Sequence, residues 1–226
     1  VFRHNKIYDG KATGIVVLRK GEGLFEQNDI YANAFAGVEV EMAGNPEFLK
    51  NTIRDGKYMG VHVHNRGLGR FVENDIYSNS VAGVSVEGLG NPRMENNRIH
   101  DGPDFGVVCH DSGEGFFEGN EVFANDKAGF MINTSGNATI TRNRIHDGHS
   151  VGVLVNENGK STLEGNEIYG NEKPGVEIET GGNPTLVKNS IYAGKDWGVY
   201  VHYCGLGRLE NNTIYQNAEG GVRIET

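Results

Sequence analysis

Histidine and glutamate recur at two neighbouring positions in the first half of this sequence, in a pattern that could support chemistry. The residues concerned are Glu39, Glu41, His62, His64, Glu87 and His110. An imidazole beside a carboxylate can exchange protons near neutral pH, and the same groups bind divalent metal ions. The six side chains share one surface only if their segments are neighbouring strands, so the surrounding pattern decides what they can do.

Four interpretations of this His/Glu patch stay open: a solvated ladder in which opposite charges alternate, a ligand-binding surface, a metal site and a catalytic site. Our functional hypothesis is ligand binding, with no catalytic residue, no metal ligand and no cofactor assigned. Carboxylates one strand away favour the charged form of an imidazole. We therefore expect His64 and His110, each beside Glu87, to titrate above the ordinary histidine pKa of about 6.5.

The segments that carry the patch belong to a repeat of 23 residues that runs through the chain without an insertion. Each copy has an asparagine, an aliphatic residue two places later and a glycine nine places later. The asparagines are Asn5, Asn28, Asn51, Asn74, Asn97, Asn120, Asn143, Asn166, Asn189 and Asn212. A fixed period in this range is typical of a solenoid, in which each copy buries its apolar face against the next.

Three short strand-like segments fit into each copy. In the copy around Asn74, Phe71 precedes the asparagine, Ile76 follows it, and Val84 and Val86 alternate after the glycine. Alternation of β-branched residues predicts strands with one buried face. The recurrent glycines exclude a helix, because each costs about 1 kcal/mol in a helix interior. They suit bends where φ is positive or places where two backbones approach closely.

Leucine-rich repeats have a similar period, but they need aliphatic residues five and eight places before the asparagine. This sequence has Gly23, Pro46 and Lys20 at such places. We therefore predict an all-β chain: a single-stranded, right-handed parallel β-helix, a solenoid of ten 23-residue coils that spans residues 1–226 as one domain. Equivalent strands of successive coils then pair at about 4.8 Å, and the asparagines stack as an amide ladder.

Residues that alternate with buried ones point outward from a strand, so the β-helix places the His/Glu patch on one sheet. The first outward column is Val16, Glu39, His62, Ser85, Val108, Met131, Leu154, Glu177, Tyr200 and Arg223. The second is Leu18, Glu41, His64, Glu87, His110, Asn133, Asn156, Glu179, His202 and Glu225. A third, mostly aromatic column is Tyr8, Tyr31, Arg54, Tyr77, His100, Phe123, His146, Tyr169, Tyr192 and Tyr215. We expect it to stack for structural reasons, with a platform for sugar rings or a partner protein as the alternative.

Successive copies alternate in one respect. Five places after the asparagine, odd copies have glycine, as in Gly10 and Gly56, whereas even copies have asparagine, as in Asn33 and Asn79. The sequence therefore has a longer repeat of 46 residues.

The composition excludes some partners. Thirty acidic against 21 basic residues give a net charge of −9, which disfavours nucleic acid. No apolar run is long enough to cross a membrane, and no signal peptide opens the sequence. The chain begins and ends in mid-pattern, so we expect it to be a fragment of a longer chain. Cys109 and Cys204 lie four coils apart, too far for a disulfide.

The pattern Asn-x-Ile-(Tyr/His)-Asp-Gly, followed by Gly-Val-x-Val and Glu-x-Asn-Asp-Ile-Tyr, resembles the β-helix repeats of the carbohydrate-binding and sugar-hydrolase type. It is most similar to the β-helix region of F-box proteins of the F-box only protein 11 type, which hold substrates for ubiquitin ligation. Residues 26–33 and 73–79 carry the likeness best. The resemblance implies a β-helix over all ten copies and substrate recognition without turnover.

The expected function is therefore a non-catalytic binding or scaffold β-helix that presents a sheet to a protein or polysaccharide partner. The alternative is a polysaccharide-active enzyme of the uronate C5-epimerase or lyase type. Against it, the Asp-Pro-His motif of such epimerases is absent, and the first two outward columns contain only one arginine, Arg223. An F-box-like protein is expected to be intracellular, and a polysaccharide-active one secreted or periplasmic.

Overall fold

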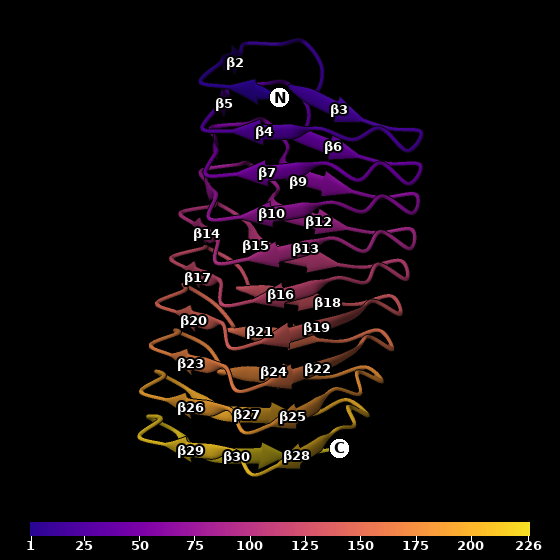
Figure 1. Cartoon of the computed structure of the whole chain (residues 1–226). Coiled ribbons are helices and arrows are strands. Elements are labelled where there is room, and N and C mark those ends of the chain that lie inside the picture. Colours follow the sequence, from indigo (N-terminus) through magenta and orange to yellow (C-terminus); the bar gives the residue numbers. More distant parts are fainter.

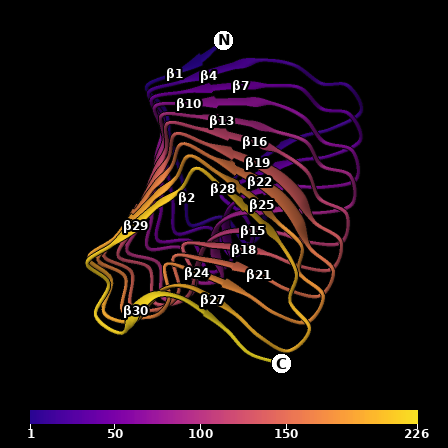
Figure 2. The same cartoon turned by 90° about the horizontal axis from the view of Figure 1, so that it is seen from below.

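Thirty short strands, arranged in three ten-stranded parallel sheets, make up the computed structural model of residues 1–226 (Figure 1). Each coil contributes one strand to each sheet, and the ten coils form a rod roughly 48 Å long at ordinary strand spacing. The right-handed parallel β-helix predicted from the repeat is confirmed. Figure 2, which looks along the rod, shows that the outline of each coil is displaced gradually from the last, as expected of twisted strands.

The strands of sheet A are β1 (Phe2–Arg3), β4 (Leu24–Glu26), β7 (Glu47–Leu49), β10 (Arg70–Val72), β13 (Arg93–Glu95), β16 (Phe116–Glu118), β19 (Asn137–Thr141), β22 (Lys160–Glu164), β25 (Thr185–Val187) and β28 (Arg208–Glu210). Those of sheet B are β2 (Lys6–Tyr8), β5 (Asp29–Tyr31), β8 (Thr52–Arg54), β11 (Asp75–Tyr77), β14 (Arg98–His100), β17 (Glu121–Phe123), β20 (Arg144–His146), β23 (Glu167–Tyr169), β26 (Ser190–Tyr192) and β29 (Thr213–Tyr215). Those of sheet C are β3 (Ile15–Val17), β6 (Val38–Val40), β9 (Met59–Val63), β12 (Ala82–Val86), β15 (Phe105–Cys109), β18 (Phe130–Ile132), β21 (Val153–Val155), β24 (Val176–Ile178), β27 (Trp197–Val201) and β30 (Gly220–Ile224).

The core runs through the rod as columns of like residues. Ile76 of sheet B pairs with Ile53 of the preceding coil and Ile99 of the following one, and all three are fully buried. In sheet A, Phe48 and Phe71 stack with ring centroids 5.0 Å apart. The core cluster contains 34 buried residues from all three sheets. Each coil therefore buries its apolar face against its neighbours, as a solenoid requires.

The asparagine column forms the predicted amide ladder. Asn51 Oδ1 accepts hydrogen bonds from the backbone nitrogen and the side-chain amide of Asn28, both at 2.9 Å. Asn51 Nδ2 donates to Asn74 Oδ1 and to the carbonyl of Phe25, both at 2.9 Å. The amide thus uses both of its hydrogens and both lone pairs while the residue is almost fully buried.

A second ladder explains why the repeat has a longer period of 46 residues. Asn79 Oδ1 accepts from the backbone nitrogen of Gly56 in the preceding coil at 3.0 Å, and its amide donates to the carbonyl of Ile53 at 3.0 Å. A Cβ on Gly56 would stand 2.8 Å from Asn79 Oδ1. An asparagine in every even coil therefore requires a glycine in the odd coil before it.

The glycines nine places after the ladder asparagines are sites of close approach. A Cβ on Gly83 would lie 2.5 Å from Ile99 Cγ2 and 2.8 Å from the Gly106 carbonyl oxygen. Of the two expected reasons for glycine, close backbone approach is therefore the one that holds for this column, and positive φ is not. Left-handed conformations recur instead at non-glycine residues between the sheets, such as Lys50 (φ 53°) and Asp55 (φ 54°). Their backbone nitrogens donate to Val72 and Tyr77 of the next coil, at 3.0 and 3.3 Å, which offsets the strain.

Two further expectations concern the whole chain. Both cysteines are free, and Cys109 is buried in the core as predicted. No helix long and apolar enough to span a membrane occurs anywhere in the chain.

Replacing Gly83 with valine should lower the free energy of unfolding by at least about 1–3 kcal/mol, because the added methyl groups overlap Ile99 and the Gly106 backbone. The matched control is Gly221→Val in the last coil, where a Cβ meets nothing closer than 3.8 Å. Urea unfolding of both variants measures the difference. Equal losses at the two positions would contradict close approach as the reason for glycine.

Replacing Asn97 with alanine should cost at least about 3 kcal/mol, because it removes the partner of two Asn74 donors and of the buried Phe71 carbonyl. Asn5→Ala in the first coil should cost less than about 1 kcal/mol, since Asn28 Oδ1 keeps its bond from the Asn5 backbone nitrogen. Urea unfolding again measures both changes. A similar loss in the two variants would show that the ladder contributes little.

Candidate functional site

The outward face of sheet C carries the His/Glu patch. Glu39 pairs in register with His62, and His62 with Ser85, so the first column lies on adjacent strands as predicted. The residues of the second column follow the strands and continue the ladder: the backbone nitrogens of His64 and Glu87 donate to the previous coil, both at 3.0 Å. The fold therefore brings the patch together on β6, β9, β12 and β15.

Two of the three His–Glu contacts in the patch run along diagonals, and the third joins neighbours in one column. His64 Nε2 lies 3.0 Å from Glu39 Oε1, and His62 Nε2 lies 3.0 Å from Glu87 Oε1. His110 Nε2 approaches the other oxygen of Glu87 at 3.3 Å. The His64 side chain pairs with Glu39 and not with its column neighbour Glu87, whereas His110 pairs with Glu87. The His64–Glu39 and His62–Glu87 contacts each join a first-column residue to the second-column residue of the next coil.

The patch is half-buried, contrary to the solvated ladder. The side chains of His62 and His64 are 14% and 21% exposed, and their rings stack with centroids 4.3 Å apart. Thr13 Oγ1 donates to Glu39 Oε2 at 2.8 Å and fixes that carboxylate. Glu41 forms no hydrogen bond or ion pair with its side chain, so it lies outside the network.

Burial and hydrogen bonding together determine the pKa values of His62 and Glu39 at the centre of the patch. Burial and the neighbouring His64 lower the pKa of His62 below its ordinary value, despite the opposing effect of Glu87 and Glu39. At Glu39, burial acts to raise the pKa, but hydrogen bonds from His64 and Thr13 outweigh it and lower the pKa overall. The expectation of a raised pKa concerned His64 and His110, where it stays a prediction.

A second cluster lies on the same face near the last coils, around a pocket of about 430 Å³. We call it the Trp197 pocket, after the single tryptophan of the chain. Its walls include Lys173, Glu177, Tyr200 and Arg223. The Arg223 guanidinium lies 5.1 Å from the centroid of the Tyr200 ring, and Lys173 forms no ion pair.

His202 borders this pocket. Its Nε2 lies 2.9 Å from Glu177 Oε1 and 3.7 Å from Glu179 Oε2, and its ring stacks on Tyr200 at 4.2 Å. The Tyr200 hydroxyl donates to Glu225. That hydrogen bond, with partial desolvation, raises the pKa of Tyr200. Tyr200 is therefore held in its protonated form.

Sequence reasoning found only part of this cluster. The first outward column contains Glu177, Tyr200 and Arg223, and the second contains Glu179, His202 and Glu225. Trp197 belongs to neither column, so the repeat pattern did not predict its place in the cluster. The available signal was the spacing: Glu177 and His202 stand 25 residues apart, as do Glu39 and His64.

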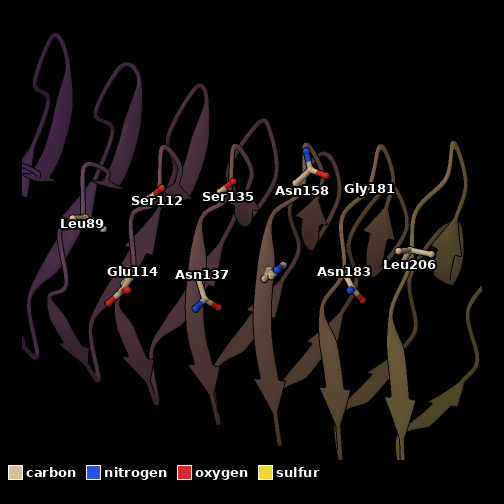
Figure 3. A pocket seen from close by; sticks show the side chains of 10 residues that line it. Leu89, Ser112, Glu114, Ser135, Asn137, Asn158, Gly181, Asn183 and Leu206 are labelled. Atoms are coloured by element: carbon tan, nitrogen blue, oxygen red, sulfur yellow. The ribbon is translucent and has the colours of Figure 1, made fainter.

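A polar groove of about 510 Å³ runs along the turns between sheets C and A (Figure 3). Two rows of side chains from successive coils line it, with Ser112 and Ser135 in one row and Glu114 and Asn137 in the other. Leu89 and Leu206 close its ends. Its course along the rod suits an extended polar chain.

The third column forms the expected stack on sheet B. Tyr192 stacks between Tyr169 and Tyr215 with centroids 5.1 and 5.0 Å apart. Arg54 interrupts the rings and places its guanidinium 4.3 Å over Tyr31. Each ring covers its neighbours, which supports a structural role, and a binding role for this column stays a prediction.

Comparison with known proteins identifies the architecture. The family model described as "Right handed beta helix region" matches residues 1–137 and 106–226. No curated protein matches the sequence, so the resemblance to F-box proteins stays a prediction from the repeats.

Among solved structures, the periplasmic alginate epimerase AlgG is similar with a TM-score of 0.73 and 14% identity, over 92% of this chain and 61% of that one. The A-module of the Azotobacter vinelandii mannuronan C-5 epimerase AlgE4 is similar with a TM-score of 0.64 and 17% identity, over 97% of this chain and 78% of that one. This chain thus spans about three fifths of AlgG. At these identities the similarity shows the fold alone.

The effects of burial and of neighbouring charges on the His62 pKa can be tested by NMR titration of chelator-treated protein. His62 should titrate below 6.5, its ordinary value. His64→Ala should raise that pKa, because it removes a neighbouring positive charge, and Glu87→Gln should lower it further. A His62 pKa at or above 6.5 in the native protein would contradict the dominance of burial.

The same shift predicts a pH dependence of stability. The folded-state pKa of His62 is depressed, so the unfolded chain takes up its proton first as the pH falls below about 6.5. The contribution of His62 to stability is therefore present above that pH and is lost as the pH falls to the folded pKa. Urea unfolding at several pH values should show that His62→Gln loses less stability than the native protein as the pH falls through this range.

Proposed function

The chain belongs to the right-handed β-helix family, and on that premise we propose that it binds a uronate-type polysaccharide along sheet C and acts on it as a C5-epimerase or lyase. The Trp197 pocket carries the proposal, because it combines aromatic faces, cations and a histidine–carboxylate pair at one place. The similarity in fold to two alginate epimerases supports the same substrate class.

The pocket has the groups that a carboxylated sugar needs. Trp197 and Tyr200 offer apolar ring surfaces for a sugar ring. Lys173 and Arg223 offer positive charge for the carboxylate, Lys173 without a competing ion pair. Because the net charge of −9 repels a polyanion, these two cations must provide the local attraction.

The second column extends the site along the rod. Asn133 Oδ1 and Asn156 Oδ1 are buried without a hydrogen-bond partner, and the amide of Asn156 donates to Glu179 at 3.2 Å. An unpaired buried oxygen costs about 1–3 kcal/mol, which a hydroxyl donor would recover. A sugar chain that leaves the pocket along this column carries such donors at short intervals.

The residues suit removal of a proton next to a carboxylate. The Glu177 carboxylate holds the Nε2–H tautomer of His202 and leaves Nδ1 with the lone pair of a base. Transfer of the C5 proton to His202 leaves a carbanion that Arg223 and Lys173 stabilise through the carboxylate. Return of a proton from solvent to the opposite face of C5 gives the epimer. Departure of the oxygen at C4, which takes up the proton, gives an unsaturated end.

Binding without turnover is the second candidate, to either a polysaccharide or a protein held as in the F-box resemblance. The regularity of the coils favours it, because no insertion enlarges a loop around the pocket. His202 is also nearly buried between Tyr200 and Tyr203, which restricts its access to a polymer.

Incubation with uronate polymers in deuterated water separates the two candidates. We expect exchange at C5, seen by NMR, or new ultraviolet absorbance from unsaturated ends. His202→Gln, which retains a donor toward Glu177, should reduce the rate at least about 100-fold. Arg223→Ala should also reduce it, whereas Arg98→Ala on sheet B should not.

Binding of the polymer with neither exchange nor absorbance would support the second candidate. Absence of both binding and turnover for every uronate polymer would overturn the proposal as a whole.

A further inference from the structure

Four side chains at the centre of the His/Glu patch point their donor atoms at one another. They are Glu39, His62, His64 and Glu87, and they come from three successive coils. Ligand atoms of Glu39, His62 and His64 all lie within 4.8 Å of one another. Glu87 Oε1 lies 3.0 Å from His62 Nε2. Two imidazole nitrogens and one carboxylate oxygen therefore surround one small region, and Glu87 adjoins that region through its contact with His62.

This donor set selects among metal ions. Tetrahedral Zn²⁺ takes imidazole nitrogen at about 2.0–2.1 Å and carboxylate oxygen at about 2.0–2.2 Å, so its ligands stand roughly 3.3 Å apart. The His64–Glu39 contact, at 3.0 Å, is close to that separation. Ca²⁺ and Mg²⁺ prefer oxygen ligands alone, which two histidines do not provide.

Neighbouring groups hold these side chains in place. Thr13 Oγ1 donates a hydrogen bond to Glu39 Oε2 at 2.8 Å, so that the other oxygen, Oε1, faces the histidines. His110 Nε2 approaches Glu87 Oε2 at 3.3 Å and leaves Oε1 toward His62. Such outer hydrogen bonds orient metal ligands, and they recur in protein metal sites. The stacked rings of His62 and His64 restrict each other further.

We propose that Glu39, His62 and His64 form a transition-metal site that binds Zn²⁺. The proposal goes beyond the polysaccharide chemistry and does not depend on it, since the Trp197 pocket lies five coils away. It also differs from our sequence-based assignment, which gave the patch no metal ligand. The other two groups of potential ligands, Glu87 with His110 and Asp111, and Glu177 with Glu179 and His202, each contain one histidine and suit zinc less well.

Zinc at this site would join coils two and three through their side chains. An ion that binds the folded chain and not the unfolded one stabilises the fold in proportion to its concentration. It would also place two positive charges on an acidic face, where Glu39 and Glu87 are the nearest carboxylates.

Calorimetric titration of the chelator-treated full chain with zinc chloride tests the proposal. We expect one zinc ion per chain. His62→Ala and His64→Ala should each weaken binding at least about 100-fold, and Thr13→Val by about 10–100-fold, because it frees the outer oxygen of Glu39. The matched control is His149→Ala, an exposed histidine paired with Asp126 at 2.8 Å, which should leave zinc binding unchanged.

Two measurements keep the result independent of folding defects. Cobalt(II) should give the intense visible absorption of a tetrahedral complex in the native chain and in His149→Ala, but not in His62→Ala. Zinc should raise the unfolding temperature of those same two proteins only. No stoichiometric binding, equal affinity for calcium, or unchanged affinity in both histidine variants would overturn the site.

Discussion

The buried amide ladder is the constraint on which the rest of this molecule depends. Each ladder asparagine accepts hydrogen bonds from backbone and side-chain donors of the preceding coil, and it donates one amide hydrogen to the next coil and the other to a carbonyl of the preceding coil. A single inserted residue between two asparagines would leave several buried polar groups without partners, each at a cost of about 1–3 kcal/mol. The ladder therefore fixes the register at 23 residues, and a fixed register places every outward column on a straight line along its sheet.

Twist then decides which outward side chains meet. Strands in a sheet rotate relative to one another, and in this rod the polar contact is often the diagonal one. The same offset joins Glu39 to His64 in sheet C, Asp75 to His100 in sheet B and Arg70 to Glu95 in sheet A. A histidine beside a carboxylate is thus a general product of the architecture and does not by itself mark a site. The patch differs from the other pairs because two histidines share it, and the Trp197 pocket because aromatic and cationic side chains surround a cavity.

The sequence predicts the coils and their columns well because a solenoid converts period directly into position. Ile76, Phe71 and Val84 lie where the repeat places them, and Asn74 bonds as the ladder requires. The pairing of His64 with Glu39 could not be read from the period, since it depends on the twist between coils. Burial of His62 depends on ring stacking with His64. The residue types in a column do not predict such stacking. The left-handed conformation of residues such as Lys50 could not be predicted from the sequence, because it is stabilised by the next coil and not by their own side chains.

The two clusters of sheet C can therefore be considered as separate sites on one support. In the first column, Val108, Met131 and Leu154 lie between them and carry no charge that could transmit a change in protonation. Coils of a solenoid contact only their neighbours, so a perturbation must pass through each intervening coil in turn. The second column is different, because Asn133 and Asn156 bring polar atoms without partners into the same interval. A ligand long enough to use those atoms would be the one element in contact with both clusters, and the polarity of this column, more than the core beneath it, would then determine whether the ends of the rod act together.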